Sequence, residues 1–396
     1  MKTQVGIIGA GPAGLMLAQT LRGYGIDCVI LEQRSEEYVL SRIRAGVLEH
    51  PTVEFLHEMG AGERLAKEGM PHEGIDLLFR GEKRRIDFPS LTGGKKVTVY
   101  GQQEVVKDLI LLKKEFDGQI LFEAEDVAIH GAESDTPSLS FTHEGQTKTL
   151  ACDFIAGCDG FHGAGRKSIP EQKLRLFEKV YPFAWLGVLA EAAPAQDELI
   201  YSRHEDGFAL FSMRSPEVTR LYLQCDPDEN LEEWPDSRVW DELHKRLEAK
   251  DGFRVNEGTI IRKDVTPMRS FVCETMRHGR LFLAGDAAHI VPPTGAKGLN
   301  LAAGDVKLLS EGLADFYKSG STAKLDGYEA LALKRIWAAQ RFSWFMTSLL
   351  HKFPDGAAFD HEIQFADLDF YTGTETGRRN VAENYVGLPF GWSGGV

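Results

Sequence analysis

The chain has 396 residues, of which 43% are hydrophobic and 26% are charged, the composition of an ordinary globular protein. Its 45 basic and 59 acidic residues leave a net charge of -14, which disfavours nucleic acid or an anionic membrane surface as a partner. At roughly 150 residues per domain, the length suggests two or three domains.

The N-terminus and the cysteines restrict the compartment and the cofactors. MKTQVGIIGAGPAG leads directly into a strand without a cleavage pattern, and no apolar window reaches the roughly 18 residues of a membrane span. We therefore expect a cytoplasmic protein. The odd number and wide spacing of the cysteines predict reduced thiols and no metal site; they are Cys28, Cys152, Cys158, Cys225 and Cys273.

The first 32 residues predict a strand, a helix and a second strand. A β-type run at 4–8 leads into Gly9-Ala10-Gly11-Pro12-Ala13-Gly14, and a second apolar run at 28–31 ends at Glu32. Glycine turns also serve plain packing. Here Gly9, Gly11 and Gly14 lie between a strand and a helix, and an acid that can bind a ribose follows 18 residues after Gly14. The segment therefore predicts dinucleotide binding.

A buried strand at 154–160 ends in Asp159-Gly160, a dipeptide that by itself is typical of a turn. From about residue 180 to 261 the pattern alternates, with short strands predicted at 198–203, 207–214 and 220–224. A five-residue connection, 215–219, would join the last two strands. An amphipathic helix at 234–247 is expected to cover this sheet.

Alternation assigns the polar side chains of these strands to faces. The three sets are Leu199, Tyr201 and Arg203; Leu210, Ser212 and Arg214; and Arg220, Tyr222 and Gln224. If the faces coincide, they form a surface that suits a small aromatic carboxylate. A solvated sheet face with salt bridges is the alternative.

A further strand, 280–286, ends in Gly285-Asp286, and the chain continues as IVPPTGAKGLN toward a helix. The prolines fix an extended backbone without amide donors, and Gly295 and Gly298 permit a close approach to a ligand. From Asn300 onward we expect mostly helix. Its most apolar stretch, KRIWAAQRFSWFMTSLL, favours packing or a subunit interface.

Together GAGPAG, CDG and LAGDAAH resemble the single-component FAD-dependent aromatic hydroxylases. Similar segments extend over nearly the whole chain and include SRIRAGVLEH, VTVYGQ, KVYPFAWLG, PMRSF and AENYVGLP. The resemblance implies an α/β fold with a Rossmann-like FAD-binding domain, an inserted mixed β-sheet domain and a helical C-terminal region that contributes to packing and a homodimer interface. The predicted boundaries are 1–73, 97–180 and 268–300 for the FAD-binding domain, 74–96 and 181–267 for the substrate-binding domain, and 301–396 for the C-terminal region.

The resemblance also implies the reaction. NADPH reduces FAD, dioxygen forms a flavin hydroperoxide, and 4-hydroxybenzoate is hydroxylated as its phenolate at the 3-position to give 3,4-dihydroxybenzoate. An unperturbed phenol loses its proton only near pH 10, so the site needs a proton relay. Two alternatives stay open: the same chemistry on a related benzoate, such as 3,4-dihydroxybenzoate or an aminobenzoate, and a flavin or aromatic-acid sensor without turnover.

By the same resemblance, Tyr201, Tyr385 and His72 form the relay, although a lone histidine is more often structural. Arg220 supplies positive charge near the flavin, and the Pro293 carbonyl faces the substrate. The residues implied in substrate binding are Tyr201, Ser212, Met213, Arg214, Tyr222 and Pro293.

The resemblance assigns cofactor contacts along the whole FAD-binding region. FAD contacts fall on Gly9, Gly11, Gly14, Glu32, Arg42, Ile43, Arg44, Ala45, Gly46, Val47, Gln102, Asp159, Asp286, Leu299 and Asn300. NADPH contacts fall on Arg34, Tyr38, Arg44, His162 and Arg269. Glu36 and Glu37 would repel a 2′-phosphate, so NADH is the alternative coenzyme. Gly165 stands where the family pattern has a small polar group.

Overall fold

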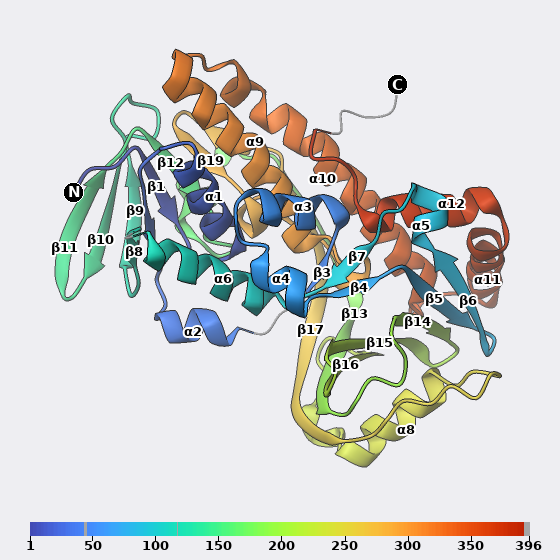
Figure 1. Cartoon of the computed structure of the whole chain (residues 1–396). Coiled ribbons are helices and arrows are strands. Elements are labelled where there is room, and N and C mark those ends of the chain that lie inside the picture. Colours follow the sequence, from blue (N-terminus) through green and yellow to red (C-terminus); the bar gives the residue numbers. More distant parts are fainter. Residues whose placement is uncertain (43–45, 117, 392–396) are drawn as a thin grey trace.

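The computed structural model describes residues 1–42, 46–116 and 118–391, and Figure 1 shows its layers. The N-terminal region is built on a six-stranded sheet whose strands are parallel except at the β18 edge. In spatial order its strands are β18 (Arg277–His278), β19 (Leu281–Leu283), β12 (Phe154–Gly157), β1 (Val5–Ile8), β2 (Cys28–Leu31) and β8 (Ile120–Leu121). The predicted strand, helix and strand of the first 32 residues are confirmed.

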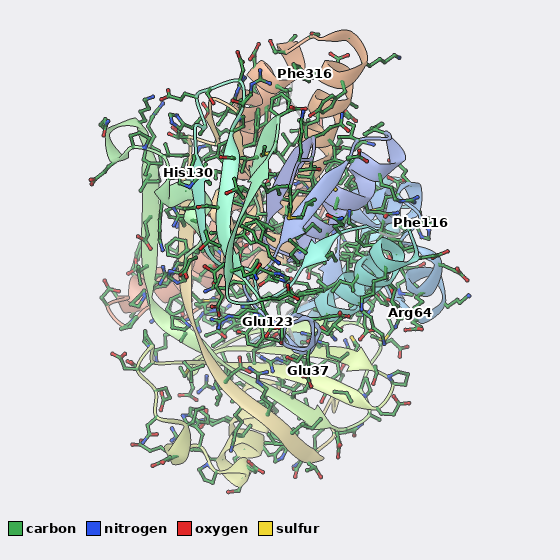
Figure 2. The ribbon with its side chains drawn as sticks, turned by 90° about the vertical axis from the view of Figure 1, so that its left-hand side faces the viewer. Glu37, Arg64, Phe116, Glu123, His130 and Phe316 are labelled. Atoms are coloured by element: carbon green, nitrogen blue, oxygen red, sulfur yellow. The ribbon has the colours of Figure 1, made fainter. Side chains whose placement is uncertain are left out.

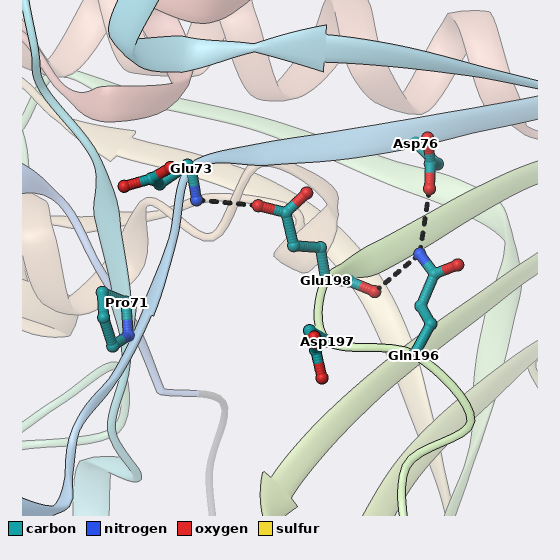
Figure 3. Close-up of a pocket in the computed structure, with 6 residues that line it drawn as sticks. All are labelled: Pro71, Glu73, Asp76, Gln196, Asp197 and Glu198. Carbon is teal, nitrogen blue, oxygen red and sulfur yellow. Dashed lines mark hydrogen bonds between the residues drawn. The ribbon is translucent and has the colours of Figure 1, made fainter.

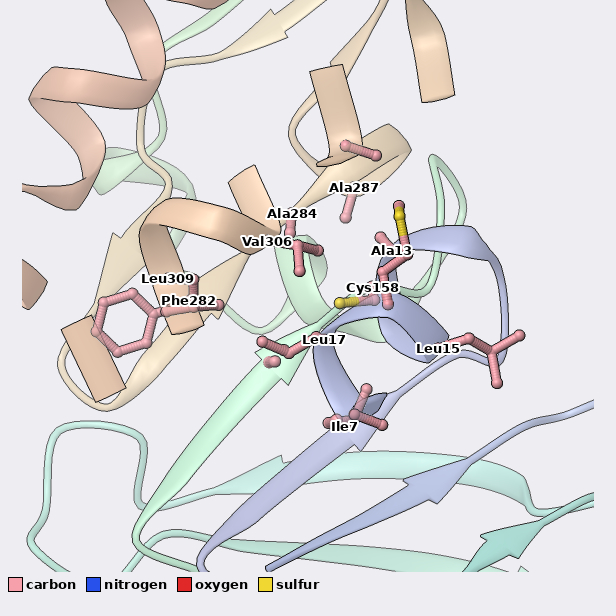
Figure 4. Packing of buried hydrophobic residues seen from close by; sticks show 14 of the residues in the cluster. Ile7, Ala13, Leu15, Leu17, Cys158, Phe282, Ala284, Ala287, Val306 and Leu309 are labelled. Atoms are coloured by element: carbon pink, nitrogen blue, oxygen red, sulfur yellow. The ribbon is translucent and has the colours of Figure 1, made fainter. Parts of the chain in front are cut away.

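Helices cover one face of this sheet, and a small sheet covers the other. The covering helices are α1 (Pro12–Gly23), α6 (Gln102–Glu115) and α9 (Gly298–Ser319). Ile7, Leu17, Phe282 and Val306 meet in the core between them (Figure 4). Both faces of strand β1 are buried, as expected for a parallel strand between two layers.

The small sheet contains β9 (Glu125–His130), β10 (Ser138–His143) and β11 (Gln146–Ala151), and Figure 2 views this side of the molecule, with His130 labelled. Its Leu139 and Leu150 join the same hydrophobic core. A Cβ on Gly6 would lie 3.0 Å from Leu139 Cδ1, so the glycine in β1 permits this close packing.

The second region is a mixed eight-stranded sheet. Its strands in spatial order are β20 (His289–Ile290), β17 (Thr259–Cys273), β13 (Leu176–Glu191), β16 (Val218–Cys225), β15 (Gly207–Ser215), β14 (Leu199–His204), β5 (Gly74–Phe79) and β6 (Glu82–Asp87). The predicted five-residue connection at 215–219 is wrong, because pairing continues to Ser215 and Val218 and leaves a two-residue turn. The predicted domain boundaries at 180/181 and 267/268 fall inside β13 and β17, and the domain division stays a prediction.

The polar side chains of the middle strands do share one face. Tyr201 pairs with Leu210, Leu210 with Tyr222, and Ser212 with Arg220, and paired residues point to the same side. We call this side the site face. The predicted amphipathic helix, α8 (Asp236–Arg246), packs on the opposite side, which we call the α8 face.

Helices α10 (Ala323–Leu350), α11 (Ala358–Gly373) and α12 (Glu375–Val386) cover the site face (Figure 1). The remaining strands, β3 (Val47–Leu48), β7 (Val97–Val99) and β4 (Met70–His72), form a sheet near the junction of the two regions. The remaining helices are α2 (Glu36–Ser41), α3 (His50–Glu58), α4 (Glu63–Glu68), α5 (Phe88–Thr92), α7 (Ala164–Lys167) and the short turns η1 (Glu171–Lys173), η2 (Leu231–Glu233), η3 (Gly285–Ala287) and η4 (Pro293–Gly295).

None of the helices in the described ranges combines the length and hydropathy needed to cross a membrane. Within the same ranges, no three His, Cys, Asp or Glu side chains are grouped so that they could hold a metal ion. All five cysteines are free thiols, four of them buried, as the sequence predicts.

Candidate active site

The glycine motif forms an open cradle at the start of α1. Gly9 has φ +100°, and a Cβ there would lie 2.5 Å from the carbonyl oxygen of Cys158. A Cβ on Gly14 would clash with the carbonyl of Gly9, whereas Gly11 faces open space. No side chain of the described residues caps the helix at Gly11, so its first amides remain available. This geometry fits the pyrophosphate of a dinucleotide.

Glu32 closes the cradle from the end of β2. Its carboxylate accepts hydrogen bonds from the amides of Ala10, at 2.7 Å, and Arg34, at 2.8 Å. A carboxylate has about four lone-pair sites, so acceptor capacity remains for a ribose. The ribose contact of Glu32 stays a prediction.

Asp159 and Asp286 follow neighbouring parallel strands, β12 and β19. Asp159 Oδ2 accepts the amide of Gly165 at 2.7 Å, and burial raises the pKa of its carboxyl. A Cβ on Gly165 would lie 3.0 Å from Asp159 Oδ1, which explains the glycine at this position. Asp286 is exposed. The loop that carries it is held by Asp305, which accepts the amide of Gly285 at 2.9 Å and bonds His289 at 2.6 Å.

A buried ion cluster lies beneath the loop that precedes α9. Glu49 bonds Lys297 at 2.6 Å and Arg335 at 2.9 Å, and all three side chains are buried. Lys297 also donates to the main-chain carbonyls of Asn384 and Tyr385. Sequence reasoning missed this cluster because its members come from three distant segments. The sequence signal that could have indicated this cluster is the presence of three ionisable residues within otherwise apolar or glycine-rich segments.

Asn300 joins this cluster to strand β3. Its Nδ2 donates to the carbonyls of Val47, at 2.9 Å, and Ala296, at 2.7 Å, and its Oδ1 accepts the amide of Glu49 at 2.9 Å. The predicted FAD contacts Val47 and Asn300 are therefore neighbours in space. Ile43, Arg44 and Ala45 lie outside the described residues.

The other predicted FAD contacts occupy different settings. Leu299 is half-buried near the start of α9, and Arg42 is exposed at the end of α2. Gln102 begins α6. A Cβ on Gly46 would clash with the carbonyl of Tyr100, so only glycine permits this approach of two chain segments.

Two tyrosine hydroxyls meet inside the protein. Tyr201 on β14 and Tyr385 on α12 are separated by 184 residues, yet their oxygens lie 2.6 Å apart. Both side chains are 1% exposed. Burial raises the pKa of both phenols well above the ordinary value. Neither tyrosine therefore ionises alone near neutral pH.

His72 ends β4 and is buried, but neither ring nitrogen has a hydrogen-bond partner among the described residues. Burial lowers the pKa of His72 to about 4, against the weaker opposing effect of Glu198 and Asp197. The ring is thus neutral at pH 7. The structure brings Tyr201 and Tyr385 together, whereas His72 makes no direct bond to either.

Next to the tyrosine pair, the site face carries a guanidinium. Arg214 donates to the hydroxyl of Tyr222 at 3.3 Å and to the carbonyl of Met213 at 2.9 Å. Its Nε is buried and has no partner among the described residues. Because a buried donor without an acceptor is costly, this nitrogen indicates a place for an anionic ligand.

The neighbouring predicted contacts are arranged differently. Ser212 donates its hydroxyl proton to the carbonyl of Arg220 at 2.6 Å. Arg220 pairs with Asp264 at 2.8 Å, and its guanidinium lies 5.0 Å from the Tyr222 ring centroid. The Met213 side chain packs on the α8 face, so any contact with a ligand on the site face would come from its main chain. Pro293 is half-buried at the start of η4.

The predicted NADPH residues among the described ones lie on the N-terminal region and, in the case of Arg269, on β17. Arg34 and Tyr38 are exposed and 5.3 Å apart, measured from the guanidinium carbon to the ring centroid. His162 is exposed. Arg269 pairs with Glu178 at 3.4 Å and lies over Phe161. The structure does not bring Arg34 and Tyr38 into one cluster with His162 and Arg269.

An open cavity of about 410 Å³ is bordered by Pro71 and Glu73, the two chain neighbours of His72, and by the segment 196–198 (Figure 3). Its lining is mostly acidic or amide: Pro71, Glu73, Asp76, Gln196, Asp197 and Glu198. The lining residues bond one another, for example Gln196 to Asp76 at 2.9 Å. An acidic surface of this kind disfavours an aromatic carboxylate, so we place the candidate site on the site face.

Comparisons with known proteins identify the family of the chain. Residues 2–343 match a family described as "FAD binding domain". The chain is 51% identical to the p-hydroxybenzoate hydroxylase of Acinetobacter baylyi, over 98% of this chain and 96% of the relative. It is 25% identical to a 3-(3-hydroxy-phenyl)propionate/3-hydroxycinnamic acid hydroxylase of Escherichia coli over 75% of this chain, and the match spans about half, 53%, of that relative.

Among solved structures, p-nitrophenol 4-monooxygenase PnpA from Pseudomonas putida DLL-E4 superposes with a TM-score of 0.84 at 20% identity, covering 97% of this chain and 98% of the other. Aklavinone-11 hydroxylase, in a complex with FAD and aklavinone, gives a TM-score of 0.74 at 21% identity, covering 88% and 69%. At these identities the structures establish the fold alone.

Proposed function

The chain belongs to the FAD-binding family of flavin-dependent aromatic hydroxylases, and from this premise we propose that it hydroxylates 4-hydroxybenzoate at the 3-position with NADPH and O2 to give 3,4-dihydroxybenzoate. The observation that carries the proposal is the buried hydroxyl pair of Tyr201 and Tyr385 on the same face as Arg214 and Tyr222. This arrangement supports a site that recognises an acid at one end and a phenol at the other.

FAD is the cofactor. The residues that would hold it are the glycine cradle with Glu32, the Asp159 and Asp286 loops, and the start of α9 with Asn300. Bound FAD supplies the redox chemistry, which comprises acceptance of a hydride and activation of dioxygen. The uncapped start of α9 adds a positive dipole end where negative charge on a reduced ring would be stabilised.

Arg214 and Tyr222 bind the carboxylate in this proposal. The unpartnered Nε of Arg214 gains an acceptor when the ligand enters. A charge-assisted hydrogen bond in a desolvated site is about twice as strong as a neutral one. Arg220, paired with Asp264, contributes positive charge without losing its own partner.

In this proposal Tyr201 accepts the phenolic proton as its own proton passes to Tyr385, and Tyr385 releases the proton it held toward His72, so that each tyrosine ends with one proton. Because burial raises the pKa of both hydroxyls, these transfers, including release of the Tyr385 proton, occur in concert rather than through a free tyrosinate. The resulting phenolate is a better ring nucleophile than the phenol. The proton that Tyr385 releases then reaches His72. This ring is neutral, has two nitrogens without partners among the described residues, and passes the proton to solvent.

For the coenzyme we propose NADPH. Arg34 and Tyr38 present a cation and an aromatic ring at the surface, and Glu36 is neutralised by Lys114 at 2.6 Å. That pairing reduces the repulsion of a 2′-phosphate. A kcat/KM ratio for NADPH over NADH above one supports this assignment, and the reverse ratio overturns it.

We also propose that the protein works as a homodimer in the cytoplasm. Large apolar side chains are exposed on the C-terminal helices, including Trp337 (40%), Trp344 (47%) and Phe359 (73%). In this proposal these side chains form one patch, and contiguous exposed apolar patches typically mark an interface. Light scattering on the purified protein tests the assembly, and a monomer overturns it.

The decisive experiment uses purified FAD-loaded protein. NADPH and O2 consumption are followed with 4-hydroxybenzoate, and the product is identified. One 3,4-dihydroxybenzoate per NADPH is expected. Consumption that yields only hydrogen peroxide, or product from 4-aminobenzoate alone, overturns the proposal.

A further inference from the structure

The imidazole of His351, which the proposed mechanism does not use, contacts aromatic residues that in turn contact Tyr222 and Tyr201. His351 follows the end of α10 and is fully buried. Its ring lies between Phe183 and Phe208, with centroid distances of 4.6 and 4.4 Å and interplanar angles of 8° and 22°. Trp185 lies nearly parallel to Phe208, with centroids 5.0 Å apart. We call these four residues the histidine stack.

Both nitrogens of His351 are bonded. Nε2 accepts the indole N–H of Trp185 at 2.7 Å, and Nδ1 lies 3.0 Å from the carbonyl of Thr347. Since Nε2 accepts, the ring proton is on Nδ1, which donates to that carbonyl. Burial lowers the pKa of His351 to about 3, so the ring stays neutral and Nε2 stays an acceptor near neutral pH.

The stack touches side chains at both ends of the proposed site. Trp185 contacts the ring of Tyr222 at 4.8 Å between centroids, and Phe208 contacts Tyr201 at 6.2 Å. Tyr222 bonds Arg214, which binds the carboxylate in the proposed function, and Tyr201 receives the phenol. A movement of the stack therefore changes the spacing of the two groups that recognise the ligand.

The third attachment is on α10. Thr347, whose carbonyl accepts from His351, places its hydroxyl 3.0 Å from that of Thr294, next to Pro293. Helix α10 thus bonds both the stack and the loop that borders the proposed substrate. Because a buried indole N–H without an acceptor is costly, loss of the His351 nitrogen would force Trp185 to reorient.

We propose that His351 is a positioning residue that acts through Trp185 and Phe208 to fix the spacing of Tyr222 and Tyr201, and so selects benzoates of one length. The inference rests on the proposed function for the identity of the ligand. One added methylene between ring and carboxylate is the change such a spacing device rejects, and pockets discriminate one methylene by about 10- to 200-fold.

Two substitutions separate the hydrogen bond from the ring. His351→Phe keeps an aromatic ring between Phe183 and Phe208 but removes the acceptor. His351→Gln keeps an acceptor at similar reach but removes the ring. Trp185→Phe and the double variant His351→Phe/Trp185→Phe complete a double-mutant cycle.

The experiment titrates 4-hydroxybenzoate and 4-hydroxyphenylacetate into the FAD-loaded proteins and measures each Kd from the flavin absorbance change. The selectivity ratio is the Kd for 4-hydroxyphenylacetate divided by the Kd for 4-hydroxybenzoate. We expect His351→Phe to lower this ratio by at least about fivefold, which corresponds to the free-energy cost of one unsatisfied buried donor. His351→Gln, which keeps an acceptor, should lower this ratio less than His351→Phe does. In the Trp185→Phe background, His351→Phe should have little further effect.

A uniform loss of affinity for both ligands with an unchanged ratio indicates a structural role only and overturns the inference. Independent effects of the two substitutions in the cycle overturn it too. If His351→Phe does not fold, His351→Gln and Trp185→Phe must still lower the ratio. Wild-type protein that binds 4-hydroxybenzoate but forms no product contradicts the proposed function alone, and wild-type protein that binds neither ligand contradicts both.

Discussion

The two faces of the eight-stranded sheet use the same strands for different purposes. On the α8 face, Phe211, Leu221 and Leu223 pack against Val239 and Leu243 in an apolar cluster. On the site face, the alternate residues of those strands include the side chains predicted to bind and deprotonate the substrate. Period-two alternation therefore lets one strand contribute stability on one side and chemistry on the other.

The polar groups buried on the site face are stable only when hydrogen bonds or ion pairs compensate for their loss of contact with water. Buried hydroxyl, guanidinium and indole groups need partners, and these come from distant segments: Tyr385 on α12, Asp264 on β17 and His351 after α10. The α8 face needs only shape and volume. Substitutions on the α8 face should therefore change folding, and those on the site face should change function. Three predictions test this contrast, and a fourth tests the buried histidine near the junction of the two regions.

The largest expected effect is on the α8 face. Phe211→Ala should lower the free energy of unfolding by about 3 to 5 kcal/mol, because it removes a fully buried ring and leaves a cavity. Denaturant unfolding measures this loss. Product formed per folded, FAD-loaded molecule should stay within about twofold of wild type. A large loss of turnover at full folding would show that the two faces are not separate.

Acid should destabilise the protein through the buried histidine near the junction of the two regions. The pKa of His72 is lowered from 6.5 to about 4, so between these values only the unfolded chain binds the proton. The free energy of unfolding should fall by about 3 kcal/mol as pH drops from 6.5 to 4, since one pKa unit corresponds to 1.36 kcal/mol.

His72→Gln provides the control for this titration. Subtracting its stability profile from that of wild type isolates the His72 contribution, because His351, with a pKa of about 3, is present in both proteins. Parallel profiles for the two proteins across pH 4 to 6.5 would contradict the prediction.

On the site face, Tyr201→Phe should leave ligand binding and flavin reduction largely intact. It should lower the rate of product formation by about 100-fold, at the lower end of what proton transfer contributes, or about 2.7 kcal/mol. Loss of the 2.6 Å bond to Tyr385 should lower stability by only about 1 kcal/mol. Product yield and NADPH oxidation, measured together, check this. Unchanged yield refutes the relay.

The smallest effect is expected at Ser212, whose hydroxyl proton is already donated to the carbonyl of Arg220. Ser212→Ala should lower stability by about 1 kcal/mol. It should weaken 4-hydroxybenzoate binding by less than about fivefold, because carboxylate binding would exchange one acceptor for another. A tenfold or larger loss of affinity would show that the hydroxyl holds the carboxylate directly.

The local elements could be predicted from sequence because their causes are local. The glycines of GAGPAG, the alternation around Tyr201 and Tyr222, and the period of α8 each depend on neighbours in the chain. The coincidence of the polar faces followed from the same alternation. The connection between β15 and β16 was predicted to be too long, because the pattern does not reveal how far the pairing of these two strands continues.

What the sequence could not reveal is long-range. The Tyr201–Tyr385 bond, the cluster of Glu49 with Lys297 and Arg335, and the histidine stack all join segments more than 100 residues apart. No periodicity encodes such contacts. Resemblance to a family named the two tyrosines, but the ion cluster and His351 emerged only from the packed chain.

The long strands β13 and β17 also determine how the protein can be recombined. They pair from Leu176 with Cys273 to Glu191 with Thr259, with register shifts between Val180 and Ala184 and between Leu189 and Ala190, and thus extend through both regions. Chimeras cut at 180 and 267 would divide this strand pair between two parents at its irregular stretch. Exchange of residues 192–258 instead transplants β14, β15, β16 and α8 while the recipient keeps its own two-stranded spine. Tyr201, Arg214 and Tyr222 would then be exchanged as a unit, whereas Tyr385, Trp185 and His351 would stay with the recipient.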